Sequence, residues 1–194
     1  DSLHHGRRTL ANHLSVTAVD SSAVALRQAE RLWNLYARMA GLTRSRLQTH
    51  HADLRHLHSG SLGEAIGRAG PFDLIVLANC LNELWSESSD PTAVRAGLIT
   101  KALSWLSPHG TLMVIEPALR ETSRALHQVR DRLVQEKRCT VYSPCLHEKD
   151  CPALLNQDDW CHEERTWDPP ASIAQIDREV GFIKDALKFS YLLL

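Results

Sequence analysis

The chain has 194 residues, of which 43% are hydrophobic, so it is long enough and apolar enough to bury the core of one domain. Its formal net charge of -1 excludes an overall basic field that would attract a nucleic-acid backbone, so RNA binding would depend on a local patch. No apolar run approaches the ~20 residues that cross a bilayer, which predicts a soluble protein without a membrane partner.

Strands and helices alternate in the first part of the chain. We expect residues 1–13 to form a helix. Residues 15–20 predict a strand because β-branched residues alternate along them, and residues 23–39 predict an amphipathic helix because their apolar residues recur mainly at helical spacing. Residues 47–53 then predict a short strand, and residues 62–69 predict a short helix.

The alternation continues in the second part. Residues 72–78 are almost all apolar, as in a strand that is covered on both faces within a parallel sheet. A helix is expected at 91–106, a turn at 108–110, a strand at 111–115 and a long helix at 119–137. This order predicts an α/β protein with a doubly wound, Rossmann-like sheet.

The regular pattern stops after the long helix. Residues 139–170 combine Cys, Trp and Pro without periodicity, and we expect them to form an irregular, cysteine-rich insertion. Helical spacing returns at 172–187, and residues 188–192 have strand-like composition. The sequence therefore predicts a Rossmann-like core over 1–138, the insertion over 139–170, and a return helix and strand of the same domain over 171–194.

Polar residues follow three of the predicted strands. Ligands of a doubly wound sheet bind beyond the carboxyl ends of its strands, where an acid closing the second strand can hold a ribose. Asp20, with Ser21 beside it, has that position; Asp53 would lie near an adenine and Asn79 near the middle of the cofactor. The alternative is that the two acids only cap helices or end strands.

The glycine-rich turn that such a nucleotide site needs after its first strand does not precede Asp20. We therefore expect that strand and turn to precede Asp1 in a longer protein. The chain also stops within the apolar run 191–194, so the sheet is predicted to be incomplete at both ends. Binding of a cofactor by this fragment alone is accordingly a weaker expectation than binding by the longer protein.

Three thiols stand close together in the irregular segment. Cys145, Cys151 and Cys161 suit zinc or an iron–sulfur cluster, because thiolates are soft ligands and intracellular cysteines rarely remain as disulfides. The alternative is that they are small buried hydrophobes. Four ligands are normally needed, and the candidates for the fourth are Cys139, His147, His162 and a residue beyond Leu194.

The order of several motifs is more specific than any one of them. The cysteine segment and the last strand contain Pro-Cys-Leu-His at 144–147, Cys-Pro at 151–152, Asp-Trp-Cys-His at 159–162 and Lys-Phe-Ser-Tyr-Leu at 188–192. Further motifs are Val-Asp-Ser-Ser at 19–22, Leu-Asn-Glu-Leu at 81–84 and Gly-Thr-Leu-Met-Val-Ile-Glu-Pro at 110–117. This set resembles the methyltransferase-like family of the mitochondrial small ribosomal subunit and its bacterial relatives.

The resemblance implies a class I methyltransferase fold with S-adenosylmethionine as nominal ligand, and association with small-subunit rRNA during ribosome assembly. It also implies a 4Fe-4S cluster on Cys145, Cys151 and Cys161, with the fourth cysteine downstream of the Phe-Ser-Tyr-Leu stretch. Glu163 departs from the family, many of whose members have an aromatic residue there. The location would be the bacterial cytoplasm, which we favour, or the mitochondrion in a eukaryote.

Two other functions remain open at this point. One is an active methyltransferase on RNA or a small molecule, although the residues after the predicted strand at 72–78 lack the Asn-Pro-Pro-aromatic motif of base-methylating enzymes and name no catalytic residue. The other is an interaction module that zinc stabilises.

Overall fold

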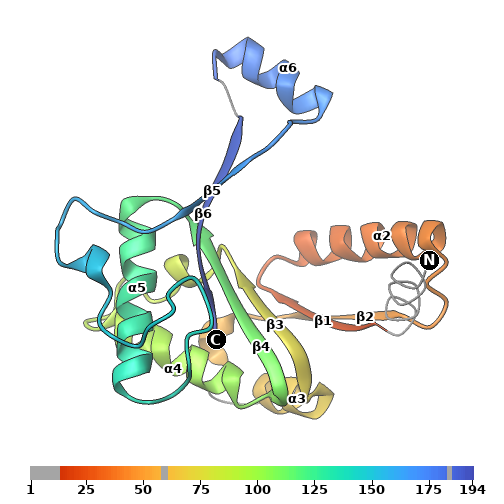
Figure 1. The fold of residues 1–194 in the computed structure, drawn as a ribbon. Coiled ribbons are helices and arrows are strands. Elements are labelled where there is room, and N and C mark those ends of the chain that lie inside the picture. Colours follow the sequence, from red (N-terminus) through yellow and green to blue (C-terminus); the bar gives the residue numbers. More distant parts are fainter. Residues whose placement is uncertain (1–13, 58–60, 183–184) are drawn as a thin grey trace, which may run out of the picture. The chain divides into compact units, whose positions relative to one another are not determined.

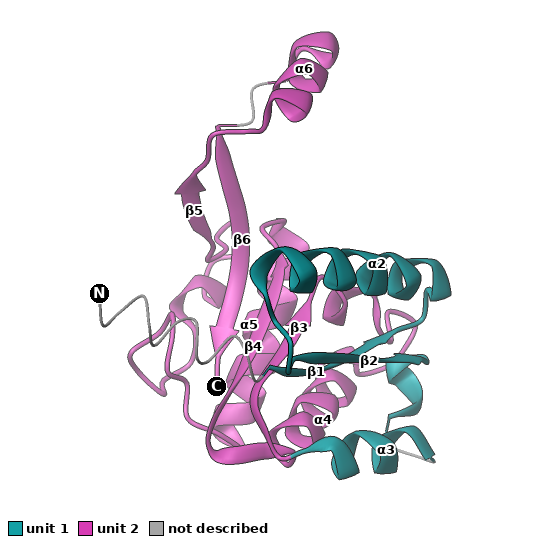
Figure 2. Cartoon of the chain, turned by 90° about the vertical axis from the view of Figure 1, so that its right-hand side faces the viewer, with its two compact units in different colours: residues 1–70 teal, residues 71–194 magenta. Residues whose placement is uncertain are grey.

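The computed structural model describes residues 14–57, 61–182 and 185–194. The described chain divides into two compact units, unit 1 (residues 1–70) and unit 2 (residues 71–194), which are treated separately below (Figure 2). The helix predicted at 1–13 lies outside the described residues. No helix among the described residues is both long and apolar enough to span a membrane.

Within its described residues, unit 1 has a parallel strand pair and two α-helices (Figure 1). Its elements are β1 (Ser15–Asp20), α2 (Ala23–Ala40), β2 (Arg46–His51), the short 3-10 helix η1 (Leu54–His56) and α3 (Ser61–Ala69). β1 and β2 pair in parallel from Ser15 opposite Arg46 to Asp20 opposite His51. The carboxyl ends of the two strands therefore meet at one edge.

Helix α2 has the boundaries that its sequence predicts. The Ser22 hydroxyl accepts a hydrogen bond from the Ala25 N–H at 3.2 Å and caps the first turn. Gly41 ends the helix in the left-handed conformation, with φ 67°, which glycine adopts without steric cost. The inner face of the helix buries Leu26, so the predicted strand–helix unit is confirmed.

Unit 2 is built on a four-stranded mixed sheet. Its main elements are β3 (Phe72–Ala78), α4 (Pro91–Leu103), β4 (Leu106–Pro117), α5 (Arg120–Gln135), β5 (Glu163–Thr166), α6 (Ala171–Val180) and β6 (Ala186–Leu193). The strand order is β3-β4-β6-β5, in which β3 and β4 are parallel and β6 is antiparallel to both of its neighbours. The predicted α/β class is confirmed in this coarse form.

Helices α4 and α5 cover one face of this sheet (Figure 1). That face buries Leu112 and Val114 of β4 against residues such as Ile99 of α4 and Val129 of α5. On the other face of β3, Leu74 is 54% exposed and Val76 is 48% exposed. The prediction that β3 is covered on both faces was therefore wrong for this chain, because the helices of unit 2 cover only one face.

The turn predicted at 108–110 was also wrong, because β4 runs through it. A register shift between Phe72 and Leu74 lets β4 pair with β3 at both Leu106 and Thr111, and a proline is tolerated at such an irregularity. A side chain at Gly110 would place its Cβ 2.7 Å from the Phe72 carbonyl oxygen, so only glycine fits the close approach.

Two further boundaries differ from the prediction. The helix expected at 172–187 ends at Val180, because Gly181 takes a left-handed conformation with φ 72°. The insertion predicted to be irregular contains β5, whose residues pair with β6 from Glu163 opposite Phe189 to Thr166 opposite Ala186. The four residues of β5 show no local sequence pattern that predicts a strand. Their pairing with β6 is what makes them one.

Candidate functional site

The cysteine segment, defined here as residues 139–162, is attached to α5 through hydrogen bonds to its backbone. Four polar side chains of the helix make these bonds, and they recur every three to four residues along it, at positions 124, 127 and 130–131. They are Arg124, His127, Arg130 and Asp131. The sequence analysis did not identify these residues. The feature that could have identified them is the polar face of the long helix that precedes the cysteines.

Arg124 is the anchor for the middle of the segment. Its guanidinium donates hydrogen bonds to the carbonyl oxygens of Asn156 and Asp159, each at 2.7 Å, and to those of Ala153 at 2.9 Å and Leu154 at 3.3 Å. Because five donors sit in one rigid plane, a single arginine can fix a whole turn in this way.

Arg130 and Asp131 form a buried ion pair beneath Cys151. The Arg130 side chain is 0% exposed and lies 2.7 Å from an Asp131 carboxylate oxygen, and its guanidinium donates to the carbonyl oxygens of His147 and Lys149. Asp131 in turn accepts the backbone N–H of Cys151 at 2.9 and 3.1 Å. The pair therefore sets the path of the chain that leads to Cys151.

His127 and Ser190 hold Cys161 from the other side. The His127 ring is buried, and burial lowers its pKa, so the ring is neutral. Its Nε2 lies 3.2 Å from the Cys161 carbonyl oxygen, which can only accept, so Nε2 carries the proton. The Ser190 hydroxyl lies 2.7 Å from the same oxygen and 2.6 Å from the Ser123 hydroxyl.

The three predicted ligand thiols lie in one region of unit 2. Burial raises the pKa of the Cys161 thiol, and the charges of Cys145 and Cys151 raise it further. Burial also raises the pKa of Cys151, followed by the charges of Asp131 and Cys145, while a hydrogen bond from the Ala153 N–H opposes this. Neighbouring thiolate charge thus disfavours the ionisation of Cys151 and Cys161, which a bound cation would reverse.

As the described residues stand, no group of three or more His, Cys, Asp or Glu side chains is arranged to hold a metal ion. Three residues within the chain are candidates for the fourth ligand, and each lies in a different environment. Cys139 has a pKa raised by burial and then by Glu148, the His147 Nδ1 accepts the Lys149 N–H at 3.2 Å, and the His162 ring stacks on Trp160 at 5.8 Å. The metal ligands stay a prediction.

Asp20, Ser21 and Asp53 lie at the shared edge of β1 and β2, as predicted from the strand ends. An Asp20 carboxylate oxygen accepts the Ser22 N–H at 2.6 Å, and the Ser21 carbonyl oxygen lies 2.9 Å from the His51 Nε2. The edge therefore presents polar groups in unit 1, and their role in binding a cofactor stays a prediction.

Asp53 is occupied by a local partner. Its carboxylate caps the 3-10 helix η1, accepts the Arg55 N–H at 2.8 Å and pairs with the Arg55 guanidinium at 2.5 Å. These contacts lower the pKa of Asp53 to about 2, with the side-chain hydrogen bond from Arg55 as the largest cause. A contact with a cofactor would have to compete with this pair.

Asn79 belongs to unit 2, where it follows β3. Its backbone takes the left-handed conformation with φ 51°, and its N–H donates to the Ile115 carbonyl oxygen at 2.8 Å. Trp85 is also left-handed, with φ 54°. Two such residues within one short loop are uncommon and mark a segment that its surroundings hold in place.

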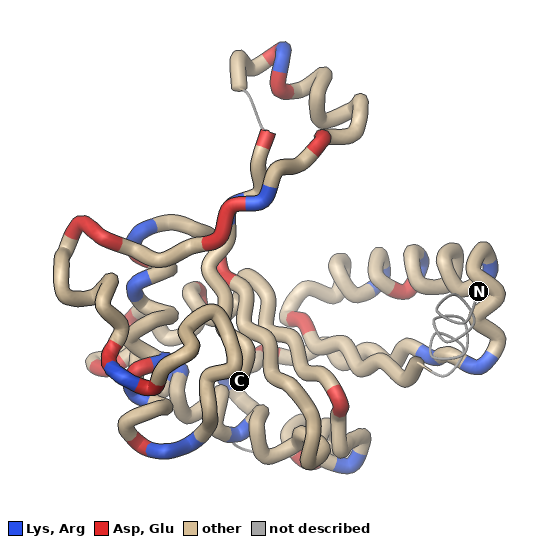
Figure 3. Tube along the Cα trace, in the orientation of Figure 1, with Lys and Arg blue, Asp and Glu red and all other residues tan. Residues whose placement is uncertain are grey.

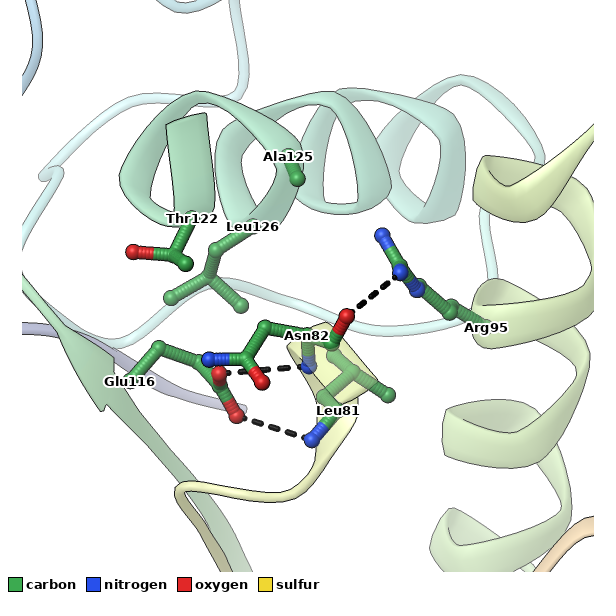
Figure 4. A pocket seen from close by; sticks show the side chains of 7 residues that line it. All are labelled: Leu81, Asn82, Arg95, Glu116, Thr122, Ala125 and Leu126. Carbon is green, nitrogen blue, oxygen red and sulfur yellow. Dashed lines mark hydrogen bonds between the residues drawn. The ribbon is translucent and has the colours of Figure 1, made fainter. Parts of the chain in front are cut away.

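Glu116 and Arg95 hold this loop in place, and the sequence analysis identified neither of them as a site residue (Figure 4). The buried Glu116 carboxylate accepts the backbone N–H groups of Leu81 at 2.9 Å and Asn82 at 3.2 Å. The Arg95 guanidinium donates to the carbonyl oxygens of Asn82 at 2.9 Å and Leu84 at 3.0 Å. The small cavity around these groups is lined by Leu81, Asn82, Arg95, Glu116, Thr122, Ala125 and Leu126.

Fold and site together define an α/β protein whose mixed sheet and neighbouring helix α5 carry a cysteine segment. Comparison with protein families places it more closely: the model of the family described as mitochondrial small ribosomal subunit Rsm22 matches residues 11–193. The chain belongs to this family, which relates it to the small ribosomal subunit. No curated protein sequence matched the chain.

Proposed function

We propose that this chain is part of a methyltransferase-like factor that binds the small ribosomal subunit and its rRNA during assembly, with a Cys-ligated iron–sulfur cluster as a structural element. The observation that carries the proposal is membership of the small-subunit family over almost the whole chain. In unit 1, Asp20, Ser21 and Asp53 lie at or just beyond the carboxyl ends of β1 and β2 and would contribute to binding S-adenosylmethionine.

The chemistry of the cysteine segment fits a cluster or zinc. Cys145, Cys151 and Cys161 supply three thiols, and the charge of Cys145 helps to raise the pKa values of Cys151 and Cys161, which a bound cation would offset. Helix α5 fixes the backbone on both sides of these cysteines. Hydrogen bonds such as that from the Ala153 N–H to the Cys151 sulfur are typical of iron–sulfur sites. A bound cluster would cross-link the segment through its thiolates.

The test is metal content. We expect the anaerobically purified full-length protein to carry about four irons and four sulfides per chain, as in a 4Fe-4S site. Cys145→Ser, Cys151→Ser and Cys161→Ser should each lose most of this metal, because each removes one ligand. Iron, sulfide and zinc are measured in all of them, with Cys80→Ser, which lies outside the segment, as the matched control.

Stoichiometric zinc in place of iron and sulfide would support the zinc-stabilised interaction module instead. Metal that persists in all three variants, or protein without metal, would contradict the cysteine site itself.

Methyl transfer is a second candidate function, because the held loop that begins at left-handed Asn79 stands where a doubly wound sheet binds its ligands. An active enzyme should transfer label from S-adenosylmethionine to small-subunit rRNA, and Asn79→Ala should reduce this transfer by an order of magnitude or more. Absence of labelled product from the full-length protein with assembling subunits would leave only the binding role.

A further inference from the structure

The two units of the chain differ in the sign of their charge. Residues 1–70 contain nine Arg and no Lys against five Asp and Glu, whereas residues 71–194 contain thirteen Lys and Arg against eighteen Asp and Glu. The formal net charge of -1 is thus the sum of a basic unit and an acidic one. The composition of the whole sequence conceals this difference in charge, because it averages the two units.

Three of these arginines line one flank of α2. Arg27, Arg31 and Arg38 are four and seven residues apart, which places them on one side of the helix, and all three are exposed. Figure 3 marks the Lys and Arg positions along the trace of the chain in blue. Arg38 donates to the Asn34 carbonyl oxygen of its own helix, at 3.1 Å. Within the described residues, none of the three forms an ion pair. We call this surface the arginine flank.

Three of the described acids of unit 1 have partners other than the arginine flank. Glu30 is the one acid of α2, and its carboxylate accepts the Thr49 hydroxyl of β2 at 2.6 Å, on the side that faces the strands. Asp20 and Asp53 lie at the carboxyl ends of β1 and β2, where Asp53 pairs with Arg55. The positive charge of the flank is therefore not neutralised by neighbouring carboxylates.

Two more arginines of unit 1 are exposed. Arg44 and Arg46 follow the helix at the opposite end of the strands from Asp20. Guanidinium groups bind phosphate through paired hydrogen bonds, so exposed arginines without acidic partners match the backbone of RNA.

We propose that the arginine flank of α2 binds the sugar–phosphate backbone of small-subunit rRNA. This inference rests on the proposed function and adds the surface and the chemistry of its contact. Contact through phosphates agrees with three unpaired arginines at helical spacing, because charge neutralisation of a backbone needs positive groups without competing acids. The alternative partner is an acidic protein surface, and the experiment must distinguish it from rRNA.

The experiment measures binding of the full-length protein to purified, labelled small-subunit rRNA by filter binding between 50 and 200 mM salt. The variant carries Arg27→Gln, Arg31→Gln and Arg38→Gln. The control carries Lys137→Gln, Arg178→Gln and Lys188→Gln, which remove the same charge from exposed positions of unit 2. Circular dichroism and metal content confirm that both remain folded.

We expect the flank variant to bind rRNA about tenfold more weakly or worse at 50 mM salt, and the slope of log K against log salt to become shallower by about 2. The control should behave like the unaltered protein. Equal affinity and slope in the flank variant would overturn the inference.

A parallel measurement with intact small subunits separates the two proposals. If the unaltered protein binds subunits but not bare rRNA, the arginine flank is not an RNA surface, while the proposed function stands. If it binds neither, both proposals fail.

Discussion

Replacement of Arg130 by methionine is expected to lower the free energy of unfolding by about 3–5 kcal/mol, the usual cost of removing one partner of a buried ion pair. The loss leaves the Asp131 carboxylate without its cation in a position that is only 12% exposed. It also removes the donors to the His147 and Lys149 carbonyl oxygens. Methionine keeps most of the apolar stem, so the change reports on the charge. Urea denaturation measures the change in the free energy of unfolding.

Arg132 provides the matched control for this prediction. It lies on the same helix, but its side chain is 42% exposed, and it pairs with Glu136 and Asp90 at the surface. Arg132→Met should therefore cost far less, because solvent screens such pairs. Equal effects of the two substitutions would show that the ion pair beneath Cys151 is not what holds the cysteine segment to α5.

Replacement of Glu116 by alanine is expected to cost about 2–5 kcal/mol, because the N–H groups of Leu81 and Asn82 would lose their acceptor within the structure. Thermal or urea unfolding measures this loss. Glu116→Gln keeps one acceptor oxygen and should cost less. An alanine variant as stable as the original would mean that water replaces the carboxylate without penalty.

Glu116 also makes stability depend on pH. Burial is the largest cause that raises the pKa of Glu116 in the folded protein, so the folded state binds this proton more readily than the unfolded state does. The contribution of Glu116 to stability therefore decreases as pH rises from its unfolded pKa of about 4.3 through the raised folded pKa, and is constant above it. Glu116→Gln should remove this slope.

The sequence predicted elements where one local pattern determines them. Ser22 and Gly41 mark both ends of α2, and the apolar run at 72–78 marks β3. Features that depend on distant partners were missed or wrong. Strand β5 exists only through its pairing with β6, and β4 continues through 108–110 because a register shift against β3 accommodates Pro108.

The candidate site shows the same division. The shared location of Cys145, Cys151 and Cys161 followed from their closeness in sequence, and the structure places these thiols within electrostatic range of one another. The polar groups that hold the segment could not be predicted in the same way. Arg130 and Glu116 are charged residues that a local pattern assigns to the surface, whereas their partners across unit 2 allow them to be buried.

The sheet order of unit 2 fixes the order in which it can be completed. Strand β6 lies between β4 and β5, although it follows β5 and α6 in the chain. Strand β5 consequently has no neighbour to pair with until β6 has been synthesised and has joined β4. Ser190 of β6 is also the residue whose hydroxyl meets the Cys161 carbonyl oxygen, so this hold on Cys161 forms only once β6 has joined the sheet.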